Sequence, residues 1–212
     1  MAKRAFLGDA MKRVTRFARD LTKRFRRDRR GIAAIEFALV VPLMLVMYLG
    51  TIEISAAVSI NRKVSRIAST VADLVTQQTE VAKTDLKGIM EIGEALLFPY
   101  DSDKPVITVV AIDVESSYPK GGKVVWSRRD NKGTFDNGGY VKNNDIEVPT
   151  DLRIDGSFLI RVDTNLDYIP IVHWLIGDTI GTVNTNGVGI IEMNERYYLR
   201  PRLGADITCS DC

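Results

Sequence analysis

The most constraining feature of this 212-residue sequence is an uncharged apolar run near its amino end. The run Phe37–Ile52 carries no charge, Glu36 and Glu53 stand at its two ends, and apolar residues continue to Ile60. A membrane-spanning helix needs about 20 mostly apolar residues. The 29 residues from Ile32 to Ile60 would form about 43 Å of helix. The two glutamates, about 26 Å apart, then fall near opposite faces of a hydrocarbon layer about 30 Å thick.

A buried core helix and a cleavable secretory signal are the alternatives to a membrane span. A core helix must be covered by surrounding protein, and the rest of the sequence is too small to wrap one this apolar. A secretory signal has an apolar region of about 7–15 residues followed by a small-residue cleavage site. This run is longer and continues into further helical pattern, so we expect a transmembrane helix over residues 32–60.

The charges divide sharply where this run begins. Residues 1–31 hold 12 of the 29 basic residues and 3 of the 27 acidic ones, which gives them a net charge of +9. The 17 basic and 24 acidic residues that remain give residues 32–212 a net charge of −7. Lys and Arg next to a span favour the cytoplasmic side. We therefore expect residues 1–31 to be a cytoplasmic leader and residues 61–212 to lie across the membrane.

The leader itself has an amphipathic pattern that suits an anionic membrane surface. A mitochondrial transit peptide is also amphipathic and Arg-rich, and a basic arm of any kind can bind nucleic acid. The span that follows at once makes adsorption to a membrane the simpler interpretation, without a nucleic-acid partner. The apolar residues at helical spacing are Phe6, Leu7, Ala10, Met11, Val14, Phe17, Ala18, Leu21 and Phe25.

Between leader and span, a glycine is followed five residues later by a glutamate and then an aromatic residue, as Gly31, Glu36 and Phe37. Ionisable residues within a membrane are costly and usually have partners. One explanation is that Glu36 lies at the interface near the positive end of the helix dipole, worth about 0.3–1 kcal/mol. The second is proteolytic. A cut after Gly31 would turn the nitrogen of Ile32 into an ammonium, with which Glu36 of a neighbouring chain can pair.

The leader, the junction and the later IASTVADLV (67–75) resemble TadE/TadG-like pilus-assembly proteins, the pseudopilins of tight-adherence (Flp) pili. The resemblance implies that a prepilin peptidase cuts the Gly31–Ile32 bond, with Glu36 and Phe37 as the matching pair. It also implies a bacterial inner-membrane location and, as partners, the assembly platform and other pilin or pseudopilin subunits. The likeness is strongest over about residues 27–77, and this family tolerates a proline such as Pro42 within the span. VVWSRR (124–129) and ERYYLRPRLG (195–204) resemble these proteins more weakly.

Beyond the span, the pattern predicts helices followed by strands. The first helix should continue as an amphipathic helix to about Gln78. A second, from about Asp85 to Leu97, should begin at a Thr84 cap and end before Pro99. From residue 105 the period changes to two, which is typical of strands, whereas the Gly, Asn and Asp residues at 130–145 indicate a surface loop. The expected strands are 106–114, 123–128 after a turn at 118–122, 158–162 and 189–199.

These elements predict an α+β protein: a transmembrane helix continues into a long amphipathic helix that packs on an antiparallel sheet outside the cytoplasm. The expected organisation is a leader at 1–31, the transmembrane helix at 32–60, a helical segment at 61–99 and a β-rich domain at 100–212. For the second helix we expect inward positions at Leu86, Ile89, Met90, Gly93, Leu96 and Leu97.

We find no catalytic constellation in the sequence and predict neither enzyme activity nor a cofactor. The single histidine, His173, lies in an apolar stretch, where a packed or interface residue is the commoner role. Asp113 and Glu115 stand at alternate positions of an expected strand and could share a face, as paired glycosidase acids must, but charged faces of exposed strands are far commoner.

Cys209 and Cys212 close the sequence as Cys-Ser-Asp-Cys. Zinc would need two further ligands, and a thioredoxin-like role would need a following helix to lower the thiol pKa. We therefore expect no metal, and a small disulfide formed in an oxidising envelope compartment. Such a loop would stiffen the tail rather than hold the fold together.

Two functions from different classes remain. One is a non-enzymatic pseudopilin or minor pilin, processed after Gly31 for tight-adherence (Flp type IVb) pilus assembly. The other is an uncleaved single-pass envelope protein whose periplasmic domain binds a ligand or an adaptor. The amino-terminal residue of the mature protein distinguishes them.

Overall fold

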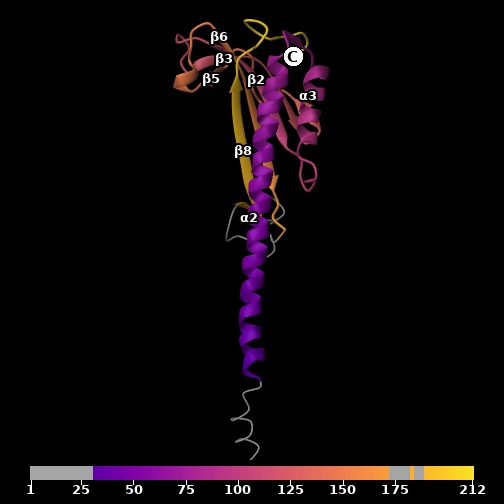
Figure 1. Ribbon diagram of the computed structural model, residues 1–212. Helices are drawn as coiled ribbons and strands as arrows, with labels where there is room; N and C mark the ends of the chain where they lie inside the picture. Colours follow the sequence, from indigo (N-terminus) through magenta and orange to yellow (C-terminus); the bar gives the residue numbers. More distant parts are fainter. Residues whose placement is uncertain (1–30, 172–181, 184–188) are drawn as a thin grey trace, which may run out of the picture. The chain divides into compact units, whose positions relative to one another are not determined.

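The computed structural model describes residues 31–171, 182–183 and 189–212. The chain divides into two compact units, residues 1–51 and 52–212. Helix α2 (Ile32–Thr76) begins in the first unit and ends in the second, where the remaining described helices and strands lie (Figure 1). The expected α+β class, with a long apolar helix followed by an antiparallel sheet, is confirmed. The four-part division expected from the sequence stays a prediction.

The part of α2 in the first unit has the properties of a membrane span. Among the described residues, α2 is the one helix long and apolar enough to cross a bilayer, and its most apolar window is unburied. Thr51 donates its hydroxyl hydrogen to the Met47 carbonyl at 2.8 Å, so this polar side chain is satisfied within the helix. Pro42 lies within the helix and leaves the Ala38 carbonyl without its usual donor. The helix continues past the proline, as expected.

In the second unit, α2 buries an apolar stripe against α3 (Lys83–Ala95) and the sheet. Gly93 of α3 lies against α2, since a Cβ added to it would lie 2.7 Å from Cγ2 of Val71. A larger residue at this position would therefore require the packed side chains around it to shift. The buried α2 residues of the stripe are Ile60, Val64, Ile67, Ala68, Val71, Ala72 and Val75.

Helix α3 begins two residues earlier than the sequence predicts. Its N-cap residue is Ala82, not Thr84, and the Asp85 carboxylate accepts the Ala82 N–H at 3.0 Å. Leu86, Met90 and Leu97 are buried, as expected, whereas Ile89 and Leu96 are only partly so. The prediction of the inward face is therefore correct, and that of the cap is wrong.

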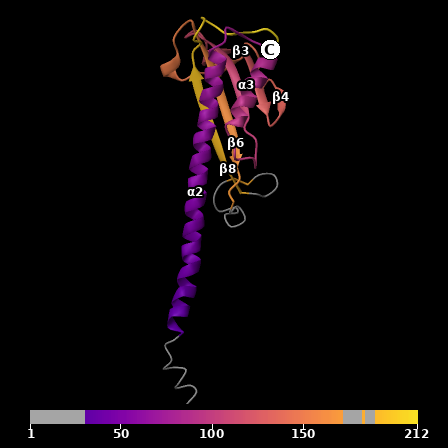
Figure 2. The same ribbon diagram turned by 45° about the vertical axis from the view of Figure 1, so that its right-hand side comes forward.

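The described strands of the main sheet pair in antiparallel fashion in the order β4-β3-β2-β6-β8-β7, and β5 also pairs with β3. Figures 1 and 2 show α2 and α3 side by side over one face of this sheet. The bounds of β6 and β8 include those expected, and the turn at 118–122 connects β2 to β3. The strands are β2 (Val106–Val114), β3 (Gly121–Asn131), β4 (Thr134–Asp136), β5 (Asp145–Glu147), β6 (Ser157–Tyr168), β7 (Thr182–Val183) and β8 (Gly189–Leu199).

Strand β2 is buried on both faces. Ile107, Val109 and Ala111 face the helices and belong to the main core. The short helix η1 (Thr150–Leu152) and the segment around it cover the opposite face through Leu152. On that face Val110, Ile112 and Val114 form a second cluster with Val124, Ile146, Val148 and Leu159.

Two features differ from the sequence prediction. The region 130–145 is not simply a loop, because β4 and the start of β5 pair with opposite ends of β3. Near the end of the chain, β9 (Thr208–Cys209) pairs in parallel with β1 (Glu80–Val81). Both differences involve strands of two or three residues, which are too short to show a periodic pattern.

Candidate functional site

The predicted processing junction lies where α2 begins. The Gly31 carbonyl accepts the first helical hydrogen bond, from the Ile35 N–H at 3.1 Å, and Ile32 is the first helical residue. Gly31 is exposed, and a Cβ added to it would meet no atom within 4 Å. Glycine is therefore not required there by the fold of the described chain, which leaves recognition by another protein as a reason for it.

Glu36 and Phe37 follow on the same exposed stretch of helix. The side chain of Phe37 is 70% exposed. Glu36 is exposed as well and makes no hydrogen bond or ion pair within the described part of the chain. In a membrane such a carboxylate is expensive without a partner. None of the described residues supplies that partner, so water at the interface, the basic leader or another chain remains to supply it.

Glu53, at the far end of the apolar run, has the opposite surroundings. It is only 7% exposed, and both carboxylate oxygens accept hydrogen bonds. The Tyr168 hydroxyl donates to Oε1 at 2.5 Å, and the Ile171 N–H donates to Oε2 at 3.1 Å. Burial, followed by the hydrogen bond to Glu53, raises the pKa of Tyr168 well above its ordinary value.

Tyr100 extends this cluster. Its hydroxyl oxygen accepts the Ile169 N–H at 3.1 Å, and its ring lies 5.6 Å from that of Tyr168. The chain just after β6 is therefore held at two points, by Glu53 and by Tyr100. In the sequence, Glu53 stands out only as an interface charge. The signal that could have found this cluster is weak, because a tyrosine 115 residues away leaves no local pattern.

The sheet face opposite the helices carries a row of mostly charged residues across five strands. Asp136, Arg129, Thr108, Asp163 and Arg196 stand in register from β4 to β8. Asp163 pairs with both Arg196 Nε, at 2.6 Å, and the nearly buried Arg161, at 2.9 Å. The hydrogen bond to Asp163 raises the pKa of Arg196. The ion pairs within this row join neighbouring strands on the sheet face opposite the helices, and every charged residue in the row has a neighbour of opposite charge.

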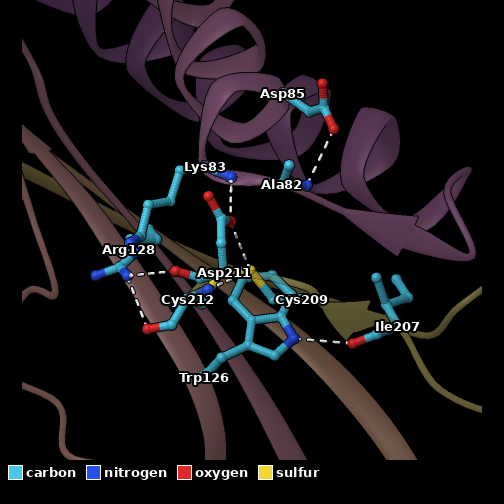
Figure 3. Close-up of a disulfide and its surroundings, with 9 residues drawn as sticks. All are labelled: Ala82, Lys83, Asp85, Trp126, Arg128, Ile207, Cys209, Asp211 and Cys212. Carbon is cyan, nitrogen blue, oxygen red and sulfur yellow. Dashed lines mark hydrogen bonds between the residues drawn. A yellow bond between two sulfur atoms is a disulfide. The ribbon is translucent and has the colours of Figure 1, made fainter.

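The carboxyl-terminal tail is fastened to the domain at several points (Figure 3). Cys209 and Cys212 form a disulfide in the structure, with a Cα–Cα distance of 5.5 Å. Trp126 donates its indole N–H to the Ile207 carbonyl at 2.8 Å, and Arg128 donates to the Cys212 carbonyl at 2.7 Å. Whether the exported protein carries this disulfide stays a prediction.

The same loop provides a cap for α3. Ala82 has no side-chain acceptor, and the Asp211 carboxylate accepts the Lys83 N–H at 2.8 Å, as Figure 3 shows. A residue 128 positions away thus does the work of an N-cap side chain. Cys209, Asp211 and Cys212 also form a group of potential metal ligands, but the disulfide occupies both sulfur atoms.

Asp113 of β2 and Glu115, which follows the end of that strand, each bind a neighbouring hydroxyl. Asp113 accepts the Tyr118 hydroxyl at 2.9 Å, which raises the pKa of Tyr118, and Glu115 accepts the Ser117 hydroxyl at 2.9 Å. The predicted amphipathic leader and His173 both fall outside the described residues.

Comparison with known proteins gives one match. Residues 31–73 match the family model of TadE-like proteins. This confirms the resemblance inferred from the sequence and indicates a protein related to Tad pili. The matched segment, which we call the TadE-like segment, begins at Gly31 and ends three residues before the end of α2. No curated protein and no solved structure matches the chain.

The TadE-like segment includes Gly31, Ile32, Glu36 and Phe37, together with Glu53 and the first part of the buried stripe of α2. Its apolar portion and the separate compact unit that follows are consistent with a single-pass membrane protein. The sheet lies outside the matched residues, as do the segments at 124–129 and 195–204.

Proposed function

We propose that this chain is a non-enzymatic, membrane-anchored pseudopilin or minor-pilin-like protein for the assembly of tight-adherence (Flp type IVb) pili. Prepilin peptidase processes it after Gly31, and the assembly platform and other pilin or pseudopilin subunits are its partners. The observation that carries this proposal is the TadE-like match, which starts at Gly31, one residue before α2 begins.

The geometry of the junction supports processing at the Gly31–Ile32 bond. Gly31 is exposed, has open space around its Cα, and precedes an exposed apolar helix. Cleavage there removes a segment with a net charge of +9 and creates a hydrophobic amino terminus at Ile32. The positive leader favours the cytoplasmic side of the inner membrane, where the basic segment would present the junction to the peptidase.

The surroundings of Glu36 support a role in subunit pairing. This carboxylate makes no hydrogen bond or ion pair within the described residues, and cleavage would create an ammonium group four residues before it. Four residues of helix rise about 6 Å. The ammonium of one subunit and Glu36 of a laterally packed neighbour could thus set the axial register between subunits. Pairing two charges in a low-dielectric environment removes the cost of burying either one alone.

The test compares Gly31→Ile with Gly50→Ile in cells that assemble the pilus. Both glycines have no atom within 4 Å of an added Cβ, so neither substitution creates a clash in the described chain. We expect Gly31→Ile to accumulate as the full-length precursor in the membrane, without pilus assembly. Gly50→Ile should be shortened like the unsubstituted protein. Normal shortening of Gly31→Ile would contradict the proposed processing site.

A further inference from the structure

The buried cluster around Glu53 holds part of the second unit at the position in the sequence where the apolar run ends. Glu53 follows Ile52, the last residue of that run. If Glu36 lies at one face of the hydrocarbon layer, Glu53 lies about 26 Å further along the helix, near the opposite face. The hydrogen bonds from Tyr168 and Ile171 to Glu53 would then hold the end of β6 near that face.

Apolar side chains flank this cluster and are left outside the core. Ile171, whose N–H binds Glu53, is 71% exposed. Ile54, the next residue after Glu53 on α2, is 67% exposed. Both residues adjoin Glu53, Ile54 in the chain and Ile171 through its hydrogen-bonded N–H, at the end of the apolar run, where the boundary of a lipid layer is expected. We call Ile54 and Ile171 the isoleucine pair.

The polar groups of the same cluster suit that boundary. Tyr100 and Tyr168 turn their hydroxyls to Ile169 and Glu53, so their polar ends are satisfied while their rings lie 5.6 Å apart. The backbone N–H groups of Ile169 and Ile171 are both bonded, so this segment can approach lipid without bare donors.

We propose that the isoleucine pair docks on the outer leaflet of the membrane, and that Glu53 and Tyr168 hold Ile171 there as positioning residues. The occupant of this surface is lipid, because the surface is continuous in the chain with the proposed span. This inference rests on the membrane-span part of the proposed function and does not depend on cleavage at Gly31. It gives the second unit a second, reversible contact with the bilayer.

The test uses the full-length chain in nanodiscs that hold one copy each, so that neighbouring subunits are absent. An environment-sensitive fluorophore is attached at Ile171→Cys, and lipids carrying a nitroxide just below the headgroup act as quenchers. Cys209 and Cys212 are joined in the structure, and the unsubstituted chain provides the labelling blank. We expect the nitroxide lipid to quench more than about half of the fluorescence at position 171.

Leu203→Cys is the matched control. Leu203 is 69% exposed, and its neighbour Arg202 pairs with Asp73 and donates its N–H to the Thr76 carbonyl. Asp73 lies 20 residues beyond Glu53 on α2, about 30 Å along the helix. We expect no quenching there. Quenching at position 171 no greater than at position 203 would overturn the proposal, as would a label at 171 shielded from both water and lipid.

Two further variants separate the causes of failure. A label at Leu45→Cys, inside the apolar run, should be strongly quenched by a nitroxide deeper in the acyl chains. If it is not, the membrane span is wrong, and the docking proposal falls with it. If Leu45 is quenched and Ile171 is not, only the docking proposal fails.

Tyr168→Phe should lower the quenching at position 171, and unchanged quenching would overturn the positioning role of Tyr168.

Discussion

The two ends of the apolar run carry the same residue in opposite surroundings. Glu36 is exposed and makes no hydrogen bond or ion pair within the described residues, whereas Glu53 is buried and binds Tyr168 and Ile171. One carboxylate is therefore satisfied by its own chain, and the other has no partner among the described residues. The difference separates a residue that holds the fold from one that, in our proposal, joins subunits.

The largest effect is expected from Glu36→Gln, and it concerns assembly alone. The substitution keeps the size of the side chain and removes the charge, so the Ile32 ammonium of a neighbour would be left unpaired. Breaking a buried ion pair by removing one partner costs about 3–5 kcal/mol, which is more than a hundredfold in association. Pilus yield should fall accordingly, while immunoblots show normal insertion and shortening.

Full piliation by Glu36→Gln would contradict the pairing role. If Glu36→Gln also unfolded at a lower urea midpoint than the unsubstituted protein, Glu36 would stabilise the fold as Glu53 does, and the contrast between the two residues would be lost.

Glu53→Ala should have the opposite effect from Glu36→Gln, because it should destabilise the fold. The substitution leaves the Tyr168 hydroxyl and the Ile171 N–H without their acceptor, and a buried donor without a partner is costly. We expect the free energy of unfolding to fall by about 2–4 kcal/mol. Urea titration of the detergent-solubilised full chain, followed by near-UV circular dichroism, measures it. Glu53→Gln, which keeps one acceptor oxygen, should lose less, and equal losses in both variants would argue against this account.

A smaller effect is expected at the far end of the second unit. Asp211→Ala removes the carboxylate that accepts the Lys83 N–H at the start of α3. Loss of an N-cap acceptor costs about 0.5–2 kcal/mol. The same titration should show this loss, and Ser210→Ala provides the control because no hydrogen bond of the Ser210 side chain is found in the described chain. If Asp211→Ala and Ser210→Ala were equally stable, the Asp211 carboxylate would not stabilise the start of α3.

The smallest effect is expected in the dependence of stability on pH. The hydrogen bond from Arg129, followed by that from the Gly138 N–H, lowers the pKa of Asp136. The folded state therefore binds fewer protons at this site than the unfolded state, whose Asp pKa is about 3.9. The contribution of Asp136 is present above that value and is lost as the pH falls through the lower, folded pKa. Because the pair is about one-third exposed, Asp136→Asn should cost less than about 1 kcal/mol at pH 6.

At a pH below the folded pKa, Asp136→Asn and the unsubstituted protein should have the same urea midpoint. If the difference in urea midpoint between Asp136→Asn and the unsubstituted protein grew as the pH fell, its sign would be wrong, and the stabilisation assigned to the ionised Asp136 would be ruled out.

Long, strongly patterned elements are predictable from the sequence. Helix α2 and the inward face of α3 each repeat a local period over ten or more residues. The pattern of β2 is ambiguous because Val106–Val114 is apolar on both faces, so the residues facing the helices cannot be told from those in the second cluster.

The features that could not be predicted from the sequence depend on contacts between distant residues. Neither the parallel pairing of β1 with β9 nor the cap from Asp211 has a local signal, since both join segments about 128 residues apart. The same is true of Glu53, whose partner Tyr168 is the last residue of β6. The junction at Gly31 is visible in the sequence because its elements are close together in the chain.

The central claim is that this protein functions after a cut between Gly31 and Ile32. The most direct measurement is the amino-terminal residue of the membrane-associated protein, determined by sequencing or by intact mass, from cells that carry pili. The account predicts a chain that begins at Ile32 and has lost the +9 leader. A chain that begins at Met1 or Ala2 in fully piliated cells would contradict it and would favour an uncleaved envelope protein instead.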